Sequence, residues 1–555
     1  MANEMPREGL RKGQSFRSTR IARRAFIGVG LATAGTALIN PNVGAAVPST
    51  KSVGIDLHPP IVDPPTQLLV PIPSERVTSA VAALDDIIGQ LMSATGVPGL
   101  AAAVVHRGQV LYSKGFGVRD ITTGAPVDRA TVFRVASVSK PLSATVVAGL
   151  VGRRLIRWSD PVARHLPAFA LLDPYVTDHV SYADLFSHSS GLPEHAGDLL
   201  EDLGYEQDYI LHALRLEELD PFRATYGYGN FGLTAAAVAA ADAAGTDWAT
   251  AADQVLFGRI GMSASSFRYS DFVARANRAA MHVQIDGNWY QKFDRDADAE
   301  APAGGASSTV VDLAKWMILR LAGGRWLGQP VIDADALLET DTPRSVSAPP
   351  GTSAGRAGFY GLGADLGYDY SGRARLSHSG AFAQGAATNY TLLPDQDLGI
   401  VVLTNGMPLG IPESITAYFL DLVVGGAIEN DWFALYSDLF AQLYVNHSVL
   451  ADKRPPAYPK PAERNAFYTG TYRNDYYGTI HVVSRGSRLH VLMPPRPTDY
   501  PLRHWDGDLF AFYPVGENAV GISAATFEPG PGHHRAARLI LEYYDKTHLG
   551  TFTRS

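Results

Sequence analysis

A serine and a lysine three positions apart are the first residues that could do chemistry. Ser137 and Lys140 lie in residues 133–141, and an apolar run at 142–150 follows them. If a helix starts here, residues three apart share one face, so the lysine amine reaches the serine hydroxyl. Serine alone is a weak nucleophile, and an amine acts as its base once burial lowers the amine's pKa. We predict Ser137 as the nucleophile and Lys140 as its proton-handling partner.

Tyr228 and Asn230 form a second candidate group, one on each side of Gly229 in a glycine-rich loop. On such a loop both side chains can point into one cleft, the phenol to relay a proton and the amide to hold a substrate carbonyl. A tyrosine, with an ordinary pKa of roughly 10, becomes a base only beside a cation such as Lys140. We predict Tyr228 as a catalytic residue and Asn230 as a substrate-binding one. A tyrosine packed into its loop is the alternative.

A third group, His378, Gly380 and Ala381, falls on an expected strand. A glycine after a basic residue lets a substrate lie along the strand edge. The backbone N–H of Ala381 could then join that of Ser137 in an oxyanion hole. We predict all three as substrate-binding residues, although His378 taken alone also fits a histidine that packs or meets solvent.

Two other patterns compete with this interpretation. Ser353 lies in a Gly-x-Ser-x-Gly sequence, the signature of the α/β-hydrolase nucleophile, but two prolines precede it where a buried strand should end. The histidines His188 and His195, like the pair His533 and His534, lack a third metal ligand at usable spacing. We therefore expect Ser353 to be inert, these histidines to be packed or solvated, and the chemistry to need neither a metal nor an organic cofactor.

The elements that must position these residues indicate an α+β domain at 76–452. Apolar residues recur at helical spacing over 77–92, and the runs 100–105 and 110–112 flank a turn as a hairpin. A helix-rich middle leads to expected strands at 375–393 and 398–404, and a helical tail covers 432–450. The pattern predicts an antiparallel sheet built from both ends of the domain, flanked by helices, with a helical subdomain.

A separate domain is expected after a proline-rich linker at 453–463. Residues 464–555 hold short alternating apolar runs separated by glycines, a pattern typical of a small all-β barrel or sandwich. We expect this domain to restrict access to the cleft, because it holds no candidate catalytic cluster.

The N-terminus is typical of an export signal. A pair of arginines, Arg23 and Arg24, precedes a weakly apolar run that ends in small residues near Ala46. We predict a twin-arginine signal peptide at 1–46 and a proline-rich lead-in at 47–75. The apolar run is short of the roughly 20 residues that a spanning helix needs, so no membrane span is expected in the mature protein.

The composition limits the function further. The 555 residues carry a formal net charge of −8 and contain no cysteine. No basic surplus is available to neutralise phosphates, which argues against a nucleic-acid partner. The absence of cysteine excludes disulfides and a thiolate nucleophile, so covalent catalysis would use a hydroxyl, an amine or a carboxylate.

The three groups, in this order and with roughly these separations, resemble the penicillin-binding-protein and class C β-lactamase-related serine hydrolases, the CubicO group, over residues 77–425. The resemblance implies a β-lactamase/transpeptidase-like fold, with Ser137, Lys140 and Tyr228 as its catalytic set. True β-lactamases carry Lys-Thr-Gly where this chain has His378-Ser379-Gly380, and histidine there resembles the D-aminopeptidase and esterase branches. The last domain resembles the lipocalin-like β-domain appended to many of these hydrolases.

Together these features predict an exported serine hydrolase, periplasmic or extracellular, that cleaves an amide or ester through a Ser137 acyl-enzyme. The expected partner is a small-molecule or peptide substrate, either a D-amino-acid peptide or amide or a small ester. A class C-like β-lactamase is the alternative enzyme. A penicillin-binding or structural relative with little turnover is the alternative outside enzymes. The sequence does not specify an oligomeric state.

Overall fold

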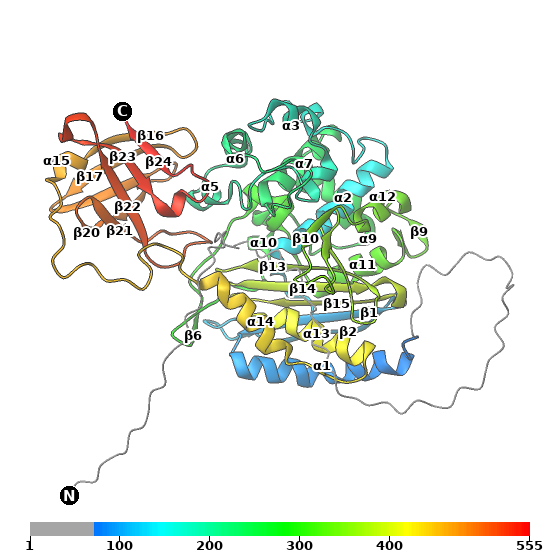
Figure 1. The fold of residues 1–555 in the computed structure, drawn as a ribbon. Coiled ribbons are helices and arrows are strands. Elements are labelled where there is room, and N and C mark those ends of the chain that lie inside the picture. Colours follow the sequence, from blue (N-terminus) through cyan, green and yellow to red (C-terminus); the bar gives the residue numbers. More distant parts are fainter. Residues whose placement is uncertain (1–70) are drawn as a thin grey trace, which may run out of the picture.

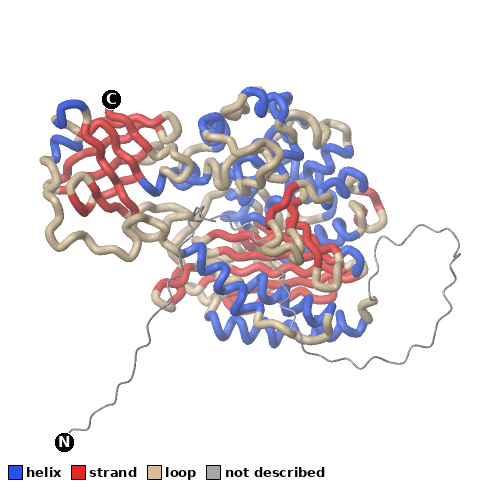
Figure 2. Tube along the Cα trace, viewed as in Figure 1, coloured by secondary structure: helices blue, strands red, loops and turns tan. Residues whose placement is uncertain are grey.

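The computed structural model describes residues 71–555, so the predicted signal at 1–46 and most of the lead-in at 47–75 lie outside the described residues. The described chain forms a larger α+β unit and a smaller unit of strands and loops beside it (Figures 1 and 2). None of the helices in this part of the chain combines the length and the apolar character required to cross a bilayer.

The α+β unit is built on an antiparallel sheet of nine strands within the described residues. Its central strands come from both ends of the unit, as the sequence predicts, because the first strand pairs with the last from Leu100 opposite Thr404 to His106 opposite Leu398. In order across the sheet the strands are β10 (Ser345–Ala348), β11 (Gly358–Tyr360), β12 (Asp365–Tyr368), β13 (Ala374–Phe382), β14 (Ala386–Leu393), β15 (Leu398–Thr404), β1 (Gly99–His106), β2 (Gln109–Asp120) and β3 (Ala125–Pro126).

Both faces of this sheet are covered, which explains why β1 is apolar from Gly99 to Val105 instead of alternating. On one face Leu100, Ala102 and Val104 pack against α1 (Ser74–Thr95) and α13 (Ile411–Val424). On the other face Ala101, Ala103 and Val105 belong to the main core, with α2 (Ser139–Gly152) and α11 (Val310–Leu321). Figure 1 shows the sheet between these two helical layers.

Helix α2 runs through the centre of the unit, and its residues 139–150 are all buried. A helical subdomain, together with α12 (Ala334–Leu338), packs around it. The helices of the subdomain are α3 (Pro174–His179), α4 (Tyr182–Phe186), α5 (Asp198–Leu203), α6 (Gln207–Ala213), α7 (Asn230–Ala243), α8 (Trp248–Ala252), α9 (Gly258–Ile260) and α10 (Tyr269–Ala274). Because α2 is surrounded on all sides, residues at its start are withdrawn from water.

The helical tail predicted at 432–450 is too long. Helix α14 spans Trp432–Ala441, and a 3-10 turn ends at Tyr444. Beyond it the Asn446 side chain accepts a hydrogen bond from the Ser448 N–H at 2.9 Å, and Glu542 accepts from the Ser448 hydroxyl at 2.6 Å. Local side-chain bonds of this kind compete with a helix, and here they replace its last turns.

The C-terminal unit begins with α15 (Asn465–Tyr468), after a segment at 453–464 without helix or strand. Its antiparallel sheet is nearly closed into a barrel, because the edge strands β19 and β20 follow each other directly in the chain and are separated by Leu502 alone. The order is β19 (Thr498–Pro501), β18 (Arg488–Met493), β17 (Gly478–Arg485), β16 (Gly470–Asn474), β24 (Thr551–Arg554), β23 (Ala536–Leu541), β22 (Ser523–Pro529), β21 (Leu509–Phe512) and β20 (Arg503–Asp506).

Candidate active site

Ser137 lies in a 3-10 turn, Ala136–Val138, directly before α2. It is partly exposed, whereas the residues on either side of it are buried. The preceding Ala136 has a φ of 46°, in the left-handed region that residues with a Cβ rarely adopt. The Ser139 hydroxyl holds this turn by donating to the Ala136 carbonyl at 2.6 Å and accepting from the Ala306 N–H at 2.9 Å. The strained turn therefore presents the Ser137 hydroxyl to solvent from a rigid base.

The Lys140 amine is fully buried and has three polar neighbours. Its Nζ lies 3.1 Å from Ser137 Oγ, 2.7 Å from Asn230 Oδ1 and 3.1 Å from the Ala303 carbonyl oxygen. Burial lowers the pKa of Lys140 to about 8. The two carbonyl oxygens can only accept hydrogen bonds, so a neutral amine must direct its two N–H groups at them. Its lone pair then faces Ser137 Oγ, the orientation that a general base requires.

Tyr228 contacts the same hydroxyl of Ser137. Its OH donates to Ser137 Oγ at 2.9 Å, and the Lys140 ammonium lies 4.7 Å from the centre of its ring. Burial raises the pKa of Tyr228 above its ordinary value, although Ser137 and a cation lie beside the ring. Tyr228 is therefore protonated at rest, and its geometry suits a proton donor.

Asn230 is the first residue of α7, and its amide is held at both ends. Besides accepting from Lys140, it donates through Nδ2 to the Asp198 carboxylate at 3.2 and 3.3 Å. Asp198 in turn lies 2.7 Å from His195 Nδ1. Asp198 was not among the residues predicted from the sequence, and His195 was weighed there only as a metal ligand. Their spacing of three residues at the start of a helix was the available signal.

Strand β13 lies directly against the serine turn. A Cβ added at Gly380 would fall 2.3 Å from the Val135 carbonyl oxygen and 2.9 Å from the Ser137 nitrogen, so only glycine permits this approach. Ala381 is the next residue on the strand, opposite Ala387 of β14. On its other edge β13 pairs with β12 only as far as Ser377, so β12 leaves this edge free beside Gly380 and Ala381. The predicted oxyanion donors, the Ser137 and Ala381 N–H groups, thus come from neighbouring segments.

His378 is buried on strand β13, two residues before Gly380. Its Nδ1 lies 2.6 Å from the Ser379 carbonyl oxygen, which can only accept, so Nδ1 carries the proton. Nε2 then accepts from the Tyr360 OH at 2.8 Å. Burial and the nearby Lys140 charge lower the pKa of His378 to about 3. The ring is therefore neutral, with a protein partner at each nitrogen, and its predicted contact with substrate stays a prediction.

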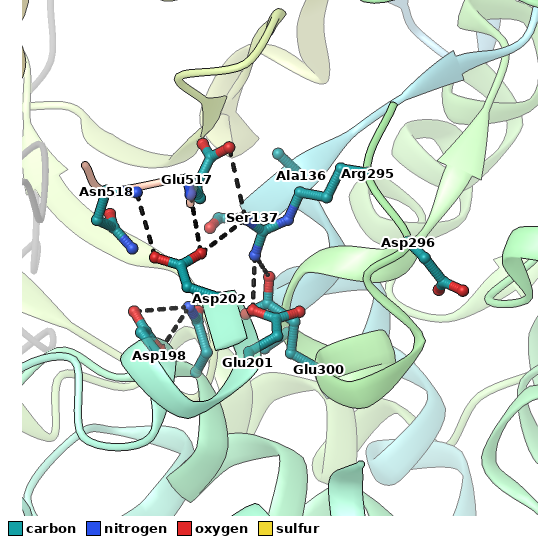
Figure 3. A network of polar contacts seen from close by, with 12 residues as sticks. Ala136, Ser137, Asp198, Glu201, Asp202, Arg295, Asp296, Glu300, Glu517 and Asn518 are labelled. Atoms are coloured by element: carbon teal, nitrogen blue, oxygen red, sulfur yellow. Dashed lines mark hydrogen bonds and ion pairs between the residues drawn. The ribbon is translucent and has the colours of Figure 1, made fainter. Parts of the chain in front are cut away.

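A second buried cation, Arg295, lies beside the serine turn, and carboxylates from three segments surround it (Figure 3). Its guanidinium lies 2.6 Å from Glu201 and 2.9 Å from Glu300 within the α+β unit. It also lies 3.4 Å from Glu517 of the C-terminal unit. Asp202 accepts from the Glu517 N–H at 2.8 Å, and Glu517 accepts from the backbone N–H groups of the turn that follows β13. The C-terminal unit therefore buttresses both Arg295 and the strand that carries Ala381.

The competing nucleophile motif lies in the wrong structural setting. Ser353 lies in an exposed loop that joins β10 to β11, a strand-to-strand connection instead of the strand-to-helix turn that its motif requires. Within residues 71–555 no group of three or more histidine, aspartate and glutamate side chains is placed to hold a metal ion. The arrangement around Ser137 offers candidates for a nucleophile, a base, a proton donor and two oxyanion donors, a set that suits acyl transfer.

Comparisons with known families agree with this geometry. The model of the Beta-lactamase family matches residues 84–424, and the model of a domain of unknown function (DUF3471) matches residues 454–545. The unguisins hydrolase ungD of Aspergillus violaceofuscus is 24% identical over 499 residues, which cover 83% of this chain and 87% of that protein. The esterase EstB of Burkholderia gladioli is 36% identical over 149 residues, or 25% of this chain and 37% of the esterase.

Two solved structures share the fold. The octameric penicillin-binding protein homologue from Pyrococcus abyssi superposes with a TM-score of 0.56 at 19% identity, covering 85% of this chain and 100% of that one. The class C beta lactamase from Rhodobacter sphaeroides gives a TM-score of 0.50 at 19% identity, covering 61% of this chain and 98% of that one. The β-lactamase/transpeptidase fold predicted from the motifs, with a barrel-like domain after it, is confirmed.

Proposed function

Because the chain belongs to the Beta-lactamase family, whose members include hydrolases and esterases, we propose that it hydrolyses an amide or ester bond through an acyl-enzyme on Ser137. The observation that carries this proposal is the convergence of two proton-handling groups on one hydroxyl. Lys140 Nζ lies 3.1 Å and the Tyr228 OH 2.9 Å from Ser137 Oγ.

In the first step Ser137 Oγ attacks the substrate carbonyl carbon while its proton passes to the lone pair of Lys140. The carbonyl oxygen gains negative charge, which the N–H groups of Ser137 and Ala381 stabilise. The Tyr228 OH then gives its proton to the departing amine or alkoxide as the carbon–leaving group bond breaks, and the Lys140 ammonium returns a proton to the phenolate. Water repeats the sequence on the acyl-enzyme, which releases the carboxylic acid and restores Ser137.

The pKa values support this division of roles. A base works best when its pKa lies near the working pH, and the pKa of Lys140 is lowered to about 8. The pKa of Tyr228 moves the other way, because its ring is buried. Lys140 is therefore the base in the free enzyme, and Tyr228 is the acid.

The proposed substrates are D-amino-acid peptides or amides and small esters. The neutral His378 ring, with both nitrogens engaged, offers no charge to a substrate carboxylate such as that of a β-lactam. The name of the esterase relative supports the inclusion of esters. We expect p-nitrophenyl esters or D-aminoacyl p-nitroanilides to be hydrolysed much faster than nitrocefin, and a direct comparison of kcat/KM tests this.

Labelling by a fluorescent fluorophosphonate tests the nucleophile. Wild-type protein should carry the label at one site, and Ser137→Ala should abolish it. Ser353→Ala is the matched control, since Ser353 lies in the exposed loop between β10 and β11. Label mapped by mass spectrometry to Ser353, or retained in Ser137→Ala, contradicts the assignment.

We propose in addition that the chain is exported by the twin-arginine route to the periplasm or the outside of the cell, because Arg23 and Arg24 precede a weakly apolar run that ends in small residues. Exchanging both arginines for lysine should keep the protein in the cytoplasmic fraction. Undiminished export of the double variant contradicts this proposal.

A further inference from the structure

A continuous hydrogen-bonded path leads from the nucleophile to a partly exposed histidine. It runs from Ser137 through Lys140 to Asn230, then to Asp198 and His195. Asp198 is buried, whereas the His195 side chain is 36% exposed. The path therefore connects a buried base to a histidine that solvent can reach, and the proposed chemistry gives neither His195 nor Asp198 a task.

Asp198 has a direct effect on the Asn230 amide. An amide has an accepting end and a donating end, and a carboxylate only accepts. With Asp198 at 3.2 Å, Nδ2 must face the carboxylate, and Oδ1 is left to face Lys140. Without an acceptor at this position the amide could rotate and turn its N–H groups toward the ammonium.

His195 is itself held in place. Its backbone N–H donates to the Tyr228 carbonyl oxygen at 2.9 Å, and its φ of 61° lies in the left-handed region. Burial acts to lower the pKa of His195, but the hydrogen bond and charge of Asp198 raise it above its ordinary value. Glu194 also raises the pKa of this ring, whereas Lys546 of the C-terminal unit lowers it.

We propose that His195 and Asp198 are positioning residues that fix the amide of Asn230 and set the charge surrounding the Lys140 amine. The inference rests on the proposed function, because it assigns these residues to the base of that reaction. Asp198 favours the ammonium form of Lys140, and the cationic form of His195 offsets the charge of Asp198. We take His195 to stay protonated while Lys140 titrates, so that the two partners act on Lys140 in opposite directions, which two merely structural residues would not do.

Substitutions of His195 or Asp198 leave the other groups around Lys140 in place. Burial dominates its pKa and lowers it, and the Glu300 carboxylate raises it as Asp198 does. Two further histidines near it, His188 and His378, have lowered pKa values and are neutral above about pH 6. A change in the titration of Lys140 can then be assigned to the substituted pair.

The test is the pH dependence of Ser137 labelling by a fluorophosphonate. Labelling should rise with pH as Lys140 loses its proton. In Asp198→Asn the midpoint should move down by roughly 0.5 to 1 pH unit, because a nearby anion is lost, and in His195→Gln it should move up by a similar amount. The matched controls are Asp178→Asn and His179→Gln, on the exposed side of α3, which should leave the midpoint unchanged.

A second readout separates this inference from the proposed function. In protein carrying 13Cε-lysine, NMR titration of the Lys140 signal, assigned by its loss in Lys140→Gln, reports the pKa without any turnover. If wild-type protein is never labelled at Ser137, the proposed function fails, and opposite NMR shifts in the two variants still support the dyad. If labelling occurs and both variants shift the same way, or not at all, the dyad is wrong and the function stands. A thermal melt of each variant checks that it is folded.

Discussion

The two buried cations beside Ser137 have opposite kinds of polar neighbours. The Lys140 ammonium is fully buried and meets only neutral oxygens directly: a hydroxyl, an amide and a backbone carbonyl. The Arg295 guanidinium is almost as well buried, yet it has three carboxylates within 3.4 Å and a fourth at 4.0 Å. Burial lowers the pKa of Lys140 to about 8. Burial also acts against the charge of Arg295, but the carboxylates around Arg295 hold the pKa of its guanidinium well above the ordinary value.

This difference suits Lys140 to the proposed chemistry and Arg295 to holding the structure together. Burial disfavours charge in both side chains, and only paired carboxylates reverse that effect. Neutral acceptors leave Lys140 able to give up its proton near neutral pH. Arg295 keeps its charge and ties α5, the segment before Ala303 and the C-terminal unit to one point (Figure 3).

The largest expected effect is on catalysis. Lys140→Met should lower kcat/KM for a p-nitrophenyl ester by roughly three to five powers of ten, because Ser137 loses its base. The free energy of unfolding should change by no more than about 2 kcal/mol, since removing a buried charge offsets the acceptors left unpaired. Paired kinetic and thermal-melt measurements check both halves. A large loss of stability with activity retained would place Lys140 with Arg295 as a structural cation.

Arg295→Met should do the reverse. Removing one partner of a buried ion cluster leaves the other charges uncompensated, which typically costs about 3–5 kcal/mol. We expect a markedly lower melting temperature, with residual activity in whatever protein remains folded. Arg268→Met is the matched control, because Arg268 pairs with Asp247 at a surface where both side chains are at least 42% exposed, and surface pairs contribute little. Equal melting temperatures for the two variants would show that Arg295 does not stabilise the structure in this way.

The contrast also marks what the sequence could predict. Ser137 and Lys140 could be predicted as a pair because one helical turn places them together. Strands β1 and β13–β15 could be predicted from their apolar runs. The Arg295 cluster could not be predicted, because its members come from segments far apart in the chain and no local spacing relates Glu517 to Glu201. For the same reason the C-terminal unit was expected only to restrict access, and its contact with the turn after β13 was missed. Whether it also restricts access stays a prediction.

Glu517 should show the contribution of the C-terminal unit as a dependence of stability on pH. Burial raises the pKa of Glu517 to about 7, above the roughly 4.3 of an unfolded chain. Between these values the folded state holds the extra proton, so its stability should fall as pH rises from about 4.5 to 7. Glu517→Gln cannot titrate and should reduce this slope in urea unfolding. The exposed Glu463→Gln is the control, and an unchanged slope in Glu517→Gln would show that the carboxylate is ionised throughout.

The smallest effect is expected at His378, which resembles neither cation because it carries no charge at all. Burial and Lys140 lower its pKa to about 3, so it should not titrate while Lys140 does. A glutamine in its place offers one acceptor for the Tyr360 OH and one donor for the Ser379 carbonyl, as the neutral ring does. His378→Gln should therefore keep the shape of the pH profile of ester hydrolysis between pH 6 and 8, with kcat/KM within roughly tenfold of wild type. An inflection near pH 6.5 that is present in wild type and lost in the variant would show that His378 takes up a proton in the working enzyme, and the neutral surroundings inferred for Lys140 would then be wrong.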